Sequence, residues 1–285
     1  MRSLLDIAKE RDDMTTLLEI TSAFEGIASM RISQIKDLVQ QSESFFADLW
    51  RIYTQLRVDE LFHFGRGQNQ GLVIPKVLLI LITSEASLSG DIDQRLVTEA
   101  IKHFRPEIND ILVVGHHGAI QLSQRGVPYI REFKMPERDR NINVMPIVLE
   151  VQKYTSTIVF YQSYVSLTDQ RVKKIQLSTA VTERGRSVTA ASEFISEQNY
   201  IFEPSAHAVI DHLERSMIQI TISEVILESK LAQYASRFKA MSAAHTKTGE
   251  TVDDLKYLYN HVKRQTKDER LKELVKVLMA RQKRA

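Results

Sequence analysis

The sequence contains no cysteine, which excludes a disulfide framework, thiol catalysis and cysteine-ligated metals. It also lacks a long apolar run: the longest, residues 77–82, has the length of a strand rather than of a membrane span. The formal net charge is only +2 over 285 residues, so no bulk charge predicts nucleic-acid binding. Residues 1–9 carry neither a secretory apolar core nor an Arg- and Ser-rich transit pattern. We therefore expect a protein of a reducing cytoplasm, with no transmembrane segment and no nucleic-acid partner.

Proline and glycine are scarce at both ends of the chain. All six prolines lie between residues 75 and 204, and eight of the ten glycines lie between residues 65 and 185. Residues 1–64 and 205–285 contain one glycine each and no proline. Because a proline inside a helix costs about 3 kcal/mol, these two segments permit two long helices. The turn-rich segment between them predicts a separate fold.

Apolar residues in the two breaker-free segments recur at alternating steps of three and four. A mean spacing of about 3.5 residues held over several heptads is typical of a coiled coil. At about 1.5 Å per residue, each helix would be longer than the roughly 50 Å diameter of a compact globule of this chain length. The sequence therefore predicts a long antiparallel two-helix coiled coil, because shorter helices joined by turns would need turn residues that these segments lack. The predicted interhelix seam contains Leu17, Ile35, Leu38, Leu49, Leu231, Phe238, Met241, Val252, Leu255 and Val262.

The central segment, residues 73–200, alternates strand-like with helix-like stretches. This alternation predicts a small Rossmann-like α/β domain with a largely parallel sheet. The predicted organisation is an N-terminal coiled-coil helix over residues 1–64, the α/β domain over 73–200 and a C-terminal coiled-coil helix over 205–285. Within the α/β domain, strands are predicted at residues 76–83, 110–115, 156–164 and 172–180, and helices at 91–104 and 141–153.

The sequence has no phosphate-loop, dinucleotide-binding or nucleophile-elbow motif, so we predict no catalytic, cofactor-binding or metal-binding residue. Gly115-His-His-Gly118 follows a predicted strand, but neighbouring histidines on a loop point apart, which favours surface histidines over a metal site. Residues 84–91 follow another strand. Their hydroxyls and carboxylates are typical of a turn with a helix cap, and a substrate site is the alternative. Trp50 lies beside the predicted seam residue Leu49 and is expected to serve packing.

Residues 235–260 run from Ala-Ser-Arg-Phe-Lys-Ala-Met to Tyr-Leu-Tyr-Asn, and this run resembles the C-terminal helix of the gamma subunits of F-type ATP synthases. Further motifs similar to that family are spread in order over the chain. Tyr200-Ile-Phe-Glu-Pro204 is similar to the family's Tyr-x-x-Glu-Pro ahead of that helix. Ile20-Thr-x-Ala-Phe24 is similar to its Ile-Thr-x-Ala-Met, and Leu81-Ile-Thr-Ser-x-x-x-Leu-Ser-Gly90 is similar to its first strand and the turn that follows.

The resemblance implies a rotor shaft that couples rotation of a membrane c ring to conformational change in catalytic beta subunits. It implies a proton- or sodium-translocating synthase, peripheral to the cytoplasmic side of the cell membrane, and no cofactor in this chain. The implied partners are the alpha and beta subunits of the catalytic hexamer, the epsilon subunit and the c ring. The residues expected to contact the hexamer are Ile20, Thr21, Phe24, Lys263, Arg264, Lys267 and Arg270, and those expected in a foot near the c ring and epsilon are Tyr200, Phe202 and Glu203.

The chain departs from the family near both of its ends, in the first helix and in the last 25 residues. Asp12, Asp13, Glu19 and Glu25 replace the family's basic first turns. Residues 261–285 carry nine Lys and Arg against three Asp and Glu, where the family is usually small and apolar. These departures leave open a divergent gamma paralogue of a specialised F-type ATPase.

Two other functions are compatible with the pattern. The first is a non-rotary coiled-coil adaptor with an α/β head, which co-purification with alpha, beta and epsilon subunits would argue against. The second is a hydrolase or ligand-binding domain with helical dimerisation arms. That reading requires a pocket with perturbed titrating groups near residues 84–91 or His116.

Overall fold

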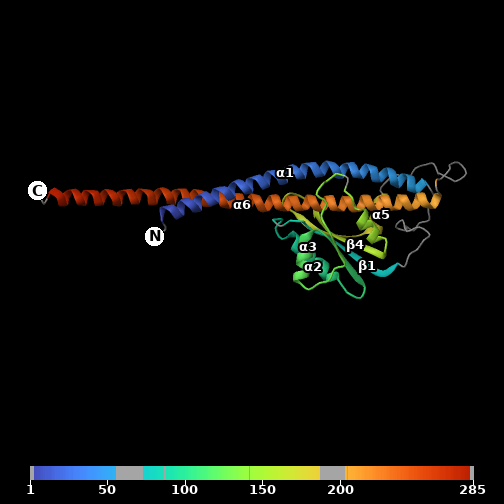
Figure 1. Ribbon diagram of the computed structural model, residues 1–285. Helices are drawn as coiled ribbons and strands as arrows, with labels where there is room; N and C mark the ends of the chain where they lie inside the picture. The colour runs from blue at the N-terminus through green and yellow to red at the C-terminus, as the bar shows by residue number, and fades with distance from the viewer. Residues whose placement is uncertain are drawn as a thin grey trace. The chain divides into compact units, whose positions relative to one another are not determined.

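The computed structural model describes residues 3–55, 73–86, 88–140, 142–186, 203 and 205–282. Its two long helices, α1 (Leu4–Gln55) and α6 (Ala206–Gln282), contain 52 and 77 residues, and a five-stranded sheet lies between them in sequence (Figure 1). Both helices are continuous, so the alternative of several short helices joined by turns is wrong for the described residues. The chain divides into two compact units: unit 1 comprises residues 1–27 and 239–285, and unit 2 comprises residues 28–238.

The sheet belongs to unit 2 and is mixed, with strand order β3-β2-β1-β4-β5. Strands β1 to β4 are parallel to their neighbours, whereas β5 runs antiparallel to β4. The prediction of a largely parallel sheet in an α/β fold is therefore confirmed. The five strands are β1 (Ile74–Ile82), β2 (Asn109–Val114), β3 (Arg131–Phe133), β4 (Tyr154–Tyr164) and β5 (Gln170–Gln176).

In the described part of unit 2 there are also four shorter helices, and they correct parts of the sequence-based assignment. The strand predicted to reach residue 180 ends at Gln176, because Leu177 and Val181 are both buried at the i, i+4 spacing of a helix. The helix predicted from residue 141 begins only at Met145, where Pro146 in the first turn favours a helix start. The histidine pair predicted to lie on a loop instead opens a helix that was not predicted. The four helices are α2 (Ile92–His103), α3 (His116–Gln124), α4 (Met145–Val151) and α5 (Leu177–Arg186).

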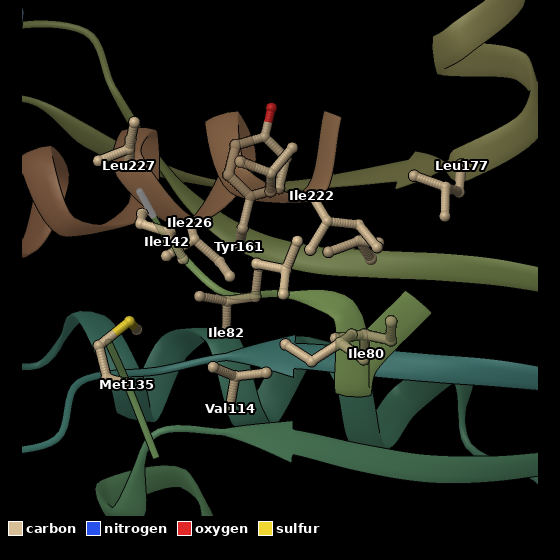
Figure 2. Close-up of a cluster of buried hydrophobic side chains, with 14 of the residues drawn as sticks. Ile80, Ile82, Val114, Met135, Ile142, Tyr161, Leu177, Ile222, Ile226 and Leu227 are labelled. Carbon is tan, nitrogen blue, oxygen red and sulfur yellow. The ribbon is translucent and has the colours of Figure 1, made fainter. Parts of the chain in front are cut away.

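The central strand β1 has a hydrophobic core on each of its faces. Alternate residues of a strand point to opposite faces, so Leu78, Ile80 and Ile82 enter one cluster and Leu79 and Leu81 enter another. The first cluster also contains side chains of α1, α4 and α6, and Figure 2 shows residues of α6 projecting towards those of β1. The second cluster contains side chains of α2 and α3, which lie on the face of the sheet turned away from α6 (Figure 1). Burial on both faces explains why β1 reads as a continuous apolar run.

A third cluster joins α1 directly to α6 within unit 2. The rings of Phe46 and Trp50 stack with 6.3 Å between centroids, and Tyr53 lies 5.4 Å beyond Trp50. These rings pack with Leu213 and Met217 of α6. The Trp50 side chain therefore serves packing, as the sequence predicted.

In unit 1, the two helical segments run antiparallel. The Arg11 guanidinium lies 5.1 Å from the ring centroid of Tyr259. Further along α1, Leu18 lies so close to Gly249 that a Cβ added there would be 3.8 Å from its Cδ1. Lower-numbered residues of α1 therefore meet higher-numbered residues of α6. A supercoil of this pair stays a prediction.

Candidate functional site

The helix pair of unit 1 presents some of the predicted hexamer-contacting side chains to solvent and turns one of them inwards. Ile20 and Phe24 of α1 are 46% and 37% exposed. Thr21 is 4% exposed, and its hydroxyl donates to the carbonyl of Leu18 at 2.9 Å. The outer surface of this pair therefore carries Ile20 and Phe24, whereas Thr21 lies within it.

The predicted seam residues differ in burial. Ile35 and Leu231 are buried in unit 2, and Met241, Val252 and Leu255 are buried in unit 1. Leu17 is 43% exposed, because its neighbour Leu18 makes the contact with Gly249 at this level of α1. Partial burial is found for Leu38, Leu49, Phe238 and Val262.

Cationic side chains cover the C-terminal part of α6. Lys263 lies with its Nζ 5.6 Å from the ring centroid of Tyr259, the same ring that Arg11 contacts. Five further cations on this part of the helix are exposed. They are Arg264, Lys267, Arg270, Lys272 and Lys276.

The predicted foot residues are described only in part. Tyr200 and Phe202 lie outside the described residues. Glu203 is exposed and precedes the start of α6 at Ala206. The position of this group relative to the sheet therefore stays a prediction.

Between β2 and α3, the chain makes a tight turn at Gly115 that packs against the C-terminal end of β1. Gly115 has a φ of 102°, and a Cβ on it would lie 2.1 Å from the backbone oxygen of Thr83. Only glycine fits this position without displacement of the backbone. The amide of Gly118 donates to the Thr83 hydroxyl at 3.0 Å, which fixes the first turn of α3 to the end of β1.

The two histidines at this turn have separate partners. His116 is exposed, and its Nδ1 lies 2.9 Å from Glu132 Oε1 on β3. The Nδ1 of His117 lies 2.8 Å from Oδ2 of Asp93 in the first turn of α2. The prediction that they lie on a loop is wrong, because the Gly115 turn places both at the start of α3.

Asp93 is the buried acceptor at this edge of the sheet and was not singled out from the sequence. Its side chain is 1% exposed. It accepts a hydrogen bond from the Ser84 amide at 3.1 Å and a second, short one from the Ser84 hydroxyl. The Ser84 hydroxyl and the His117 ring therefore share one carboxylate oxygen of Asp93. The C-terminal ends of parallel strands, where α/β folds commonly bind ligands, are here tied together by side chains of the chain itself.

A buried ion pair joins α6 to the segment before α4. Lys230 and Asp139 have side chains only 5% and 7% exposed, and the Lys230 Nζ also donates to the Pro136 carbonyl at 2.6 Å. Arg31 of α1 contacts the other carboxylate oxygen of Asp139 at 3.2 Å. One carboxylate thus connects both long helices to the sheet part of unit 2. Lys230 follows Glu228 and Ser229 along α6, so its neighbours in the sequence give no sign that it is buried.

Two tyrosine hydroxyls of β4 donate to carboxylates. Tyr154 donates to Asp110 Oδ2 at 3.0 Å, and burial together with this carboxylate raises the pKa of Tyr154 to about 12. Burial, with the neighbouring Glu228 carboxylate of α6, also raises the pKa of Tyr161. Both hydroxyls therefore stay protonated at neutral pH.

Within the described ranges, no three His, Asp or Glu side chains are grouped so that they could hold a metal ion. None of the helices in that part of the chain is both long and apolar enough to cross a membrane.

The fold defined by these elements, an α/β sheet domain with two long helices, recurs in known proteins. A profile of the family described as "ATP synthase" matches residues 3–277. The ATP synthase gamma chain of Nitrosomonas eutropha is 22% identical over 96% of this chain and 98% of its own length, and that of Chlorobium phaeobacteroides is 24% identical over 96% and 97%.

Solved structures show the same fold. A chain of the central stalk and c ring of the Tetrahymena thermophila mitochondrial ATP synthase superposes with a TM-score of 0.59 at 18% identity, over 79% of this chain and 99% of that chain. A chain of the Euglena gracilis mitochondrial ATP synthase, from the part that contains OSCP, F1 and the c ring, gives 0.58 at 14% identity over 96% and 95%.

The chain therefore belongs to the ATP synthase family. As a gamma-type chain it is a stalk subunit, and the catalytic sites of such complexes lie on the beta subunits.

Proposed function

We propose that the protein is the central-stalk rotor subunit of a proton- or sodium-translocating F-type ATP synthase. The observation that carries this proposal is the match of one family profile to nearly the whole chain. The gamma-chain relatives and the superposition on central-stalk structures support it. The proposed activity is to couple rotation of the membrane c ring to conformational change in the catalytic beta subunits.

The helix pair of unit 1 is the part proposed to act as the shaft, as an antiparallel coiled coil in the axis of an alpha and beta hexamer. Its surface differs from side to side: α1 exposes Ile20 and Phe24, and the end of α6 exposes cations. Such a surface cannot contact three identical beta subunits in the same way. Each beta subunit is therefore biased towards a different conformation, and rotation exchanges the three states as a population shift driven by differential contacts.

Unit 2 contains the proposed foot, the α/β domain over residues 73–200 with the segment that leads into α6. Its proposed partners are the c ring and the epsilon subunit, and Glu203 is the described member of the proposed contact group. The complex would be peripheral, at the cytoplasmic side of the cell membrane. Crosslinks from Glu203 that reach only alpha or beta subunits would contradict this arrangement.

The cationic end of α6 is proposed to meet acidic surfaces of the beta subunits. These cations are Lys263 and the five exposed ones beyond it. Among the described residues, none of the six forms an ion pair with a carboxylate of this chain. Complementary charge would let the shaft engage each beta subunit without an apolar contact that resists rotation. The alternative is a solvated helix end, at which cations are stabilised by the helix dipole.

Neutralising these cations as a group distinguishes the two cases. We expect the torque and the ATP hydrolysis rate of the complex to change at low salt, and the difference from wild type to fade at high salt, because screening shortens the range of charge interactions. If neither quantity differs from wild type at low salt, the end of α6 is only solvated.

Purification of the native complex tests the function itself. We expect the chain to be recovered with alpha, beta and epsilon subunits in a fixed ratio, and a bead attached to unit 2 to rotate when ATP is supplied. Recovery without those subunits, or a bead that stays still while the complex hydrolyses ATP, would favour the non-rotary adaptor.

A further inference from the structure

The contact between α6 and the sheet in unit 2 is largely apolar. Ile222 and Ile226 of α6 lie against Ile80 and Ile82 of β1 in one buried cluster (Figure 2). Burial of apolar surface stabilises this contact, but it has no preferred direction. It therefore sets which face of α6 meets the sheet, but not the exact angle of α6 about its axis.

A polar side chain interrupts this apolar contact. Gln162 of β4 is fully buried, and its Oε1 accepts hydrogen bonds from the Gln233 amide at 3.0 Å and from the Ser229 hydroxyl. Gln233 also donates to the Ser229 hydroxyl oxygen at 3.1 Å. The two α6 residues are one helical turn apart, so they present their donors to the same amide.

The opposite end of the Gln162 amide is held from the sheet side. Its Nε2 donates to Oδ1 of Asp93 at 2.6 Å. A carboxylate without a proton can only accept, so the nitrogen of the amide must face Asp93 and the oxygen must face α6. Asp93 is in turn held by Ser84 and His117. The chain of contacts thus runs from β1, α2 and α3, through β4, to α6.

We propose that Gln162, Ser229 and Gln233, together called the polar key, fix the rotational register of α6 on the sheet and carry torque between the two. The inference rests on the rotor function proposed above. A slip of α6 by one residue would turn it by about 100° and move it by about 1.5 Å. Either change would leave the buried Gln162 oxygen without its donors, and an unsatisfied buried acceptor is costly.

The other polar contacts of α6 in this region reach both a strand and loops. The Ser163 hydroxyl of β4 donates to Glu228 Oε1 at 2.6 Å. Lys230 pairs with Asp139, and the Ser236 hydroxyl donates to the Ser89 carbonyl at 2.6 Å. Among the described residues, the polar key is the side-chain link that joins α6 to Asp93, and the bond between Ser163 and Glu228 is a second link between β4 and α6. Its members touch no substrate, and their proposed role is positioning.

The test uses the double variant Ser229→Ala, Gln233→Met, which removes the two α6 members of the polar key. The variant is made in the full chain and assembled into its complex. The matched control is Ser216→Ala, because the Ser216 hydroxyl donates at 2.8 Å to the His212 carbonyl of α6 itself. The conservative variant Ser229→Thr keeps a hydroxyl for Gln162. Because the chain has no cysteine, a bead can be attached at a single introduced one, either Glu107→Cys in the turn before β2 or His212→Cys on α6.

The readout is the angular fluctuation of the bead while ATP hydrolysis is stalled. We expect the variance at Glu107→Cys to rise by about twofold in the double variant, since the link through Gln162 is then lost. The bond between Ser163 and Glu228, the Lys230–Asp139 pair and the apolar packing remain. The variance at His212→Cys and the unloaded hydrolysis rate should stay at the parent values. Ser216→Ala and Ser229→Thr should leave all three unchanged.

An unchanged variance at Glu107→Cys in the double variant would overturn the inference. This holds even if the isolated chain had become less stable, because the polar key would then stabilise the fold without carrying torque. An equal rise at both beads would also overturn it, since the added compliance would lie outside the α6–sheet contact. If neither bead rotates in the parent complex, the rotor function itself fails.

Discussion

The buried pair between Lys230 and Asp139 gives the sharpest stability prediction. Replacing Asp139 by Asn keeps the shape of the side chain but leaves the Lys230 ammonium, 5% exposed, without its counter-charge. Removing one partner of a buried ion pair costs about 3–5 kcal/mol. We expect about 3 kcal/mol for D139N, the lower end of that range, because the Pro136 carbonyl still accepts from Lys230 at 2.6 Å.

Removing Lys230 instead of Asp139 should lower the free energy of unfolding by less. This difference between the two single variants is the diagnostic result. With Lys230→Met, the Asp139 carboxylate keeps Arg31 at 3.2 Å, and the 39% exposure of the Arg31 side chain lets water reach that pair. We expect about 1–2 kcal/mol for K230M, and for the double variant less than the sum of the two single costs, because no unpaired ammonium is then buried.

Urea unfolding of the full chain, followed by the fluorescence of its single tryptophan, measures these costs. Trp50 is suitable because it packs between α1 and α6 in the same unit. The matched control is D48N, which breaks the Arg51–Asp48 pair on the surface, with side chains 51% and 62% exposed. It should cost under about 0.5 kcal/mol. A D139N variant as stable as D48N, or a K230M variant less stable than D139N, would refute the reasoning.

Three further outcomes are expected. In the same urea assay, Gly115→Ala should destabilise unit 2 by more than about 3 kcal/mol, because the added Cβ would lie 2.1 Å from the Thr83 backbone oxygen. Gly126→Ala should destabilise it by only about 1 kcal/mol, because Gly126 has a φ of 67° but open space around it. The pKa of Tyr154 is raised from 10.0 to about 12 in the folded chain, so the stability it contributes is complete below pH 10 and is lost as the pH rises towards 12. Tyr154→Phe should accordingly lose less stability than the parent across that window in thermal melts, and an identical decline in both would contradict the assignment. The isolated chain, which has no phosphate loop, should hydrolyse no ATP; turnover that survives removal of contaminating ATPases would contradict its role as a stalk subunit.

The candidate site was only partly predictable. The exposed cations at the end of α6 follow from their sequence, because nine of residues 261–285 are Lys or Arg and such side chains are seldom fully buried unless they are paired. The polar key does not follow from it. Gln162 stands inside an apolar strand, and the sequence alone does not say whether such a residue faces solvent, another strand or a helix. Its partners Asp93 and Gln233 are 69 and 71 residues away along the chain.

The sequence by itself determined the two long helices, the apolar runs of β1 and β2 and the α/β class, because these depend on local properties: helix-breaking residues, apolar spacing and the length of each run. It also determined the family, through motifs that keep their order along the chain. The tertiary structure alone decided the end of β5, the helix that begins at His116 and the exposure of Leu17. In each case the deciding contact comes from a distant segment: the cores that take up Leu177 and Val181, the backbone of Thr83 against Gly115, and Gly249 against Leu18. Local patterns fix which residues can be buried, and only packing between segments fixes which neighbour each one meets.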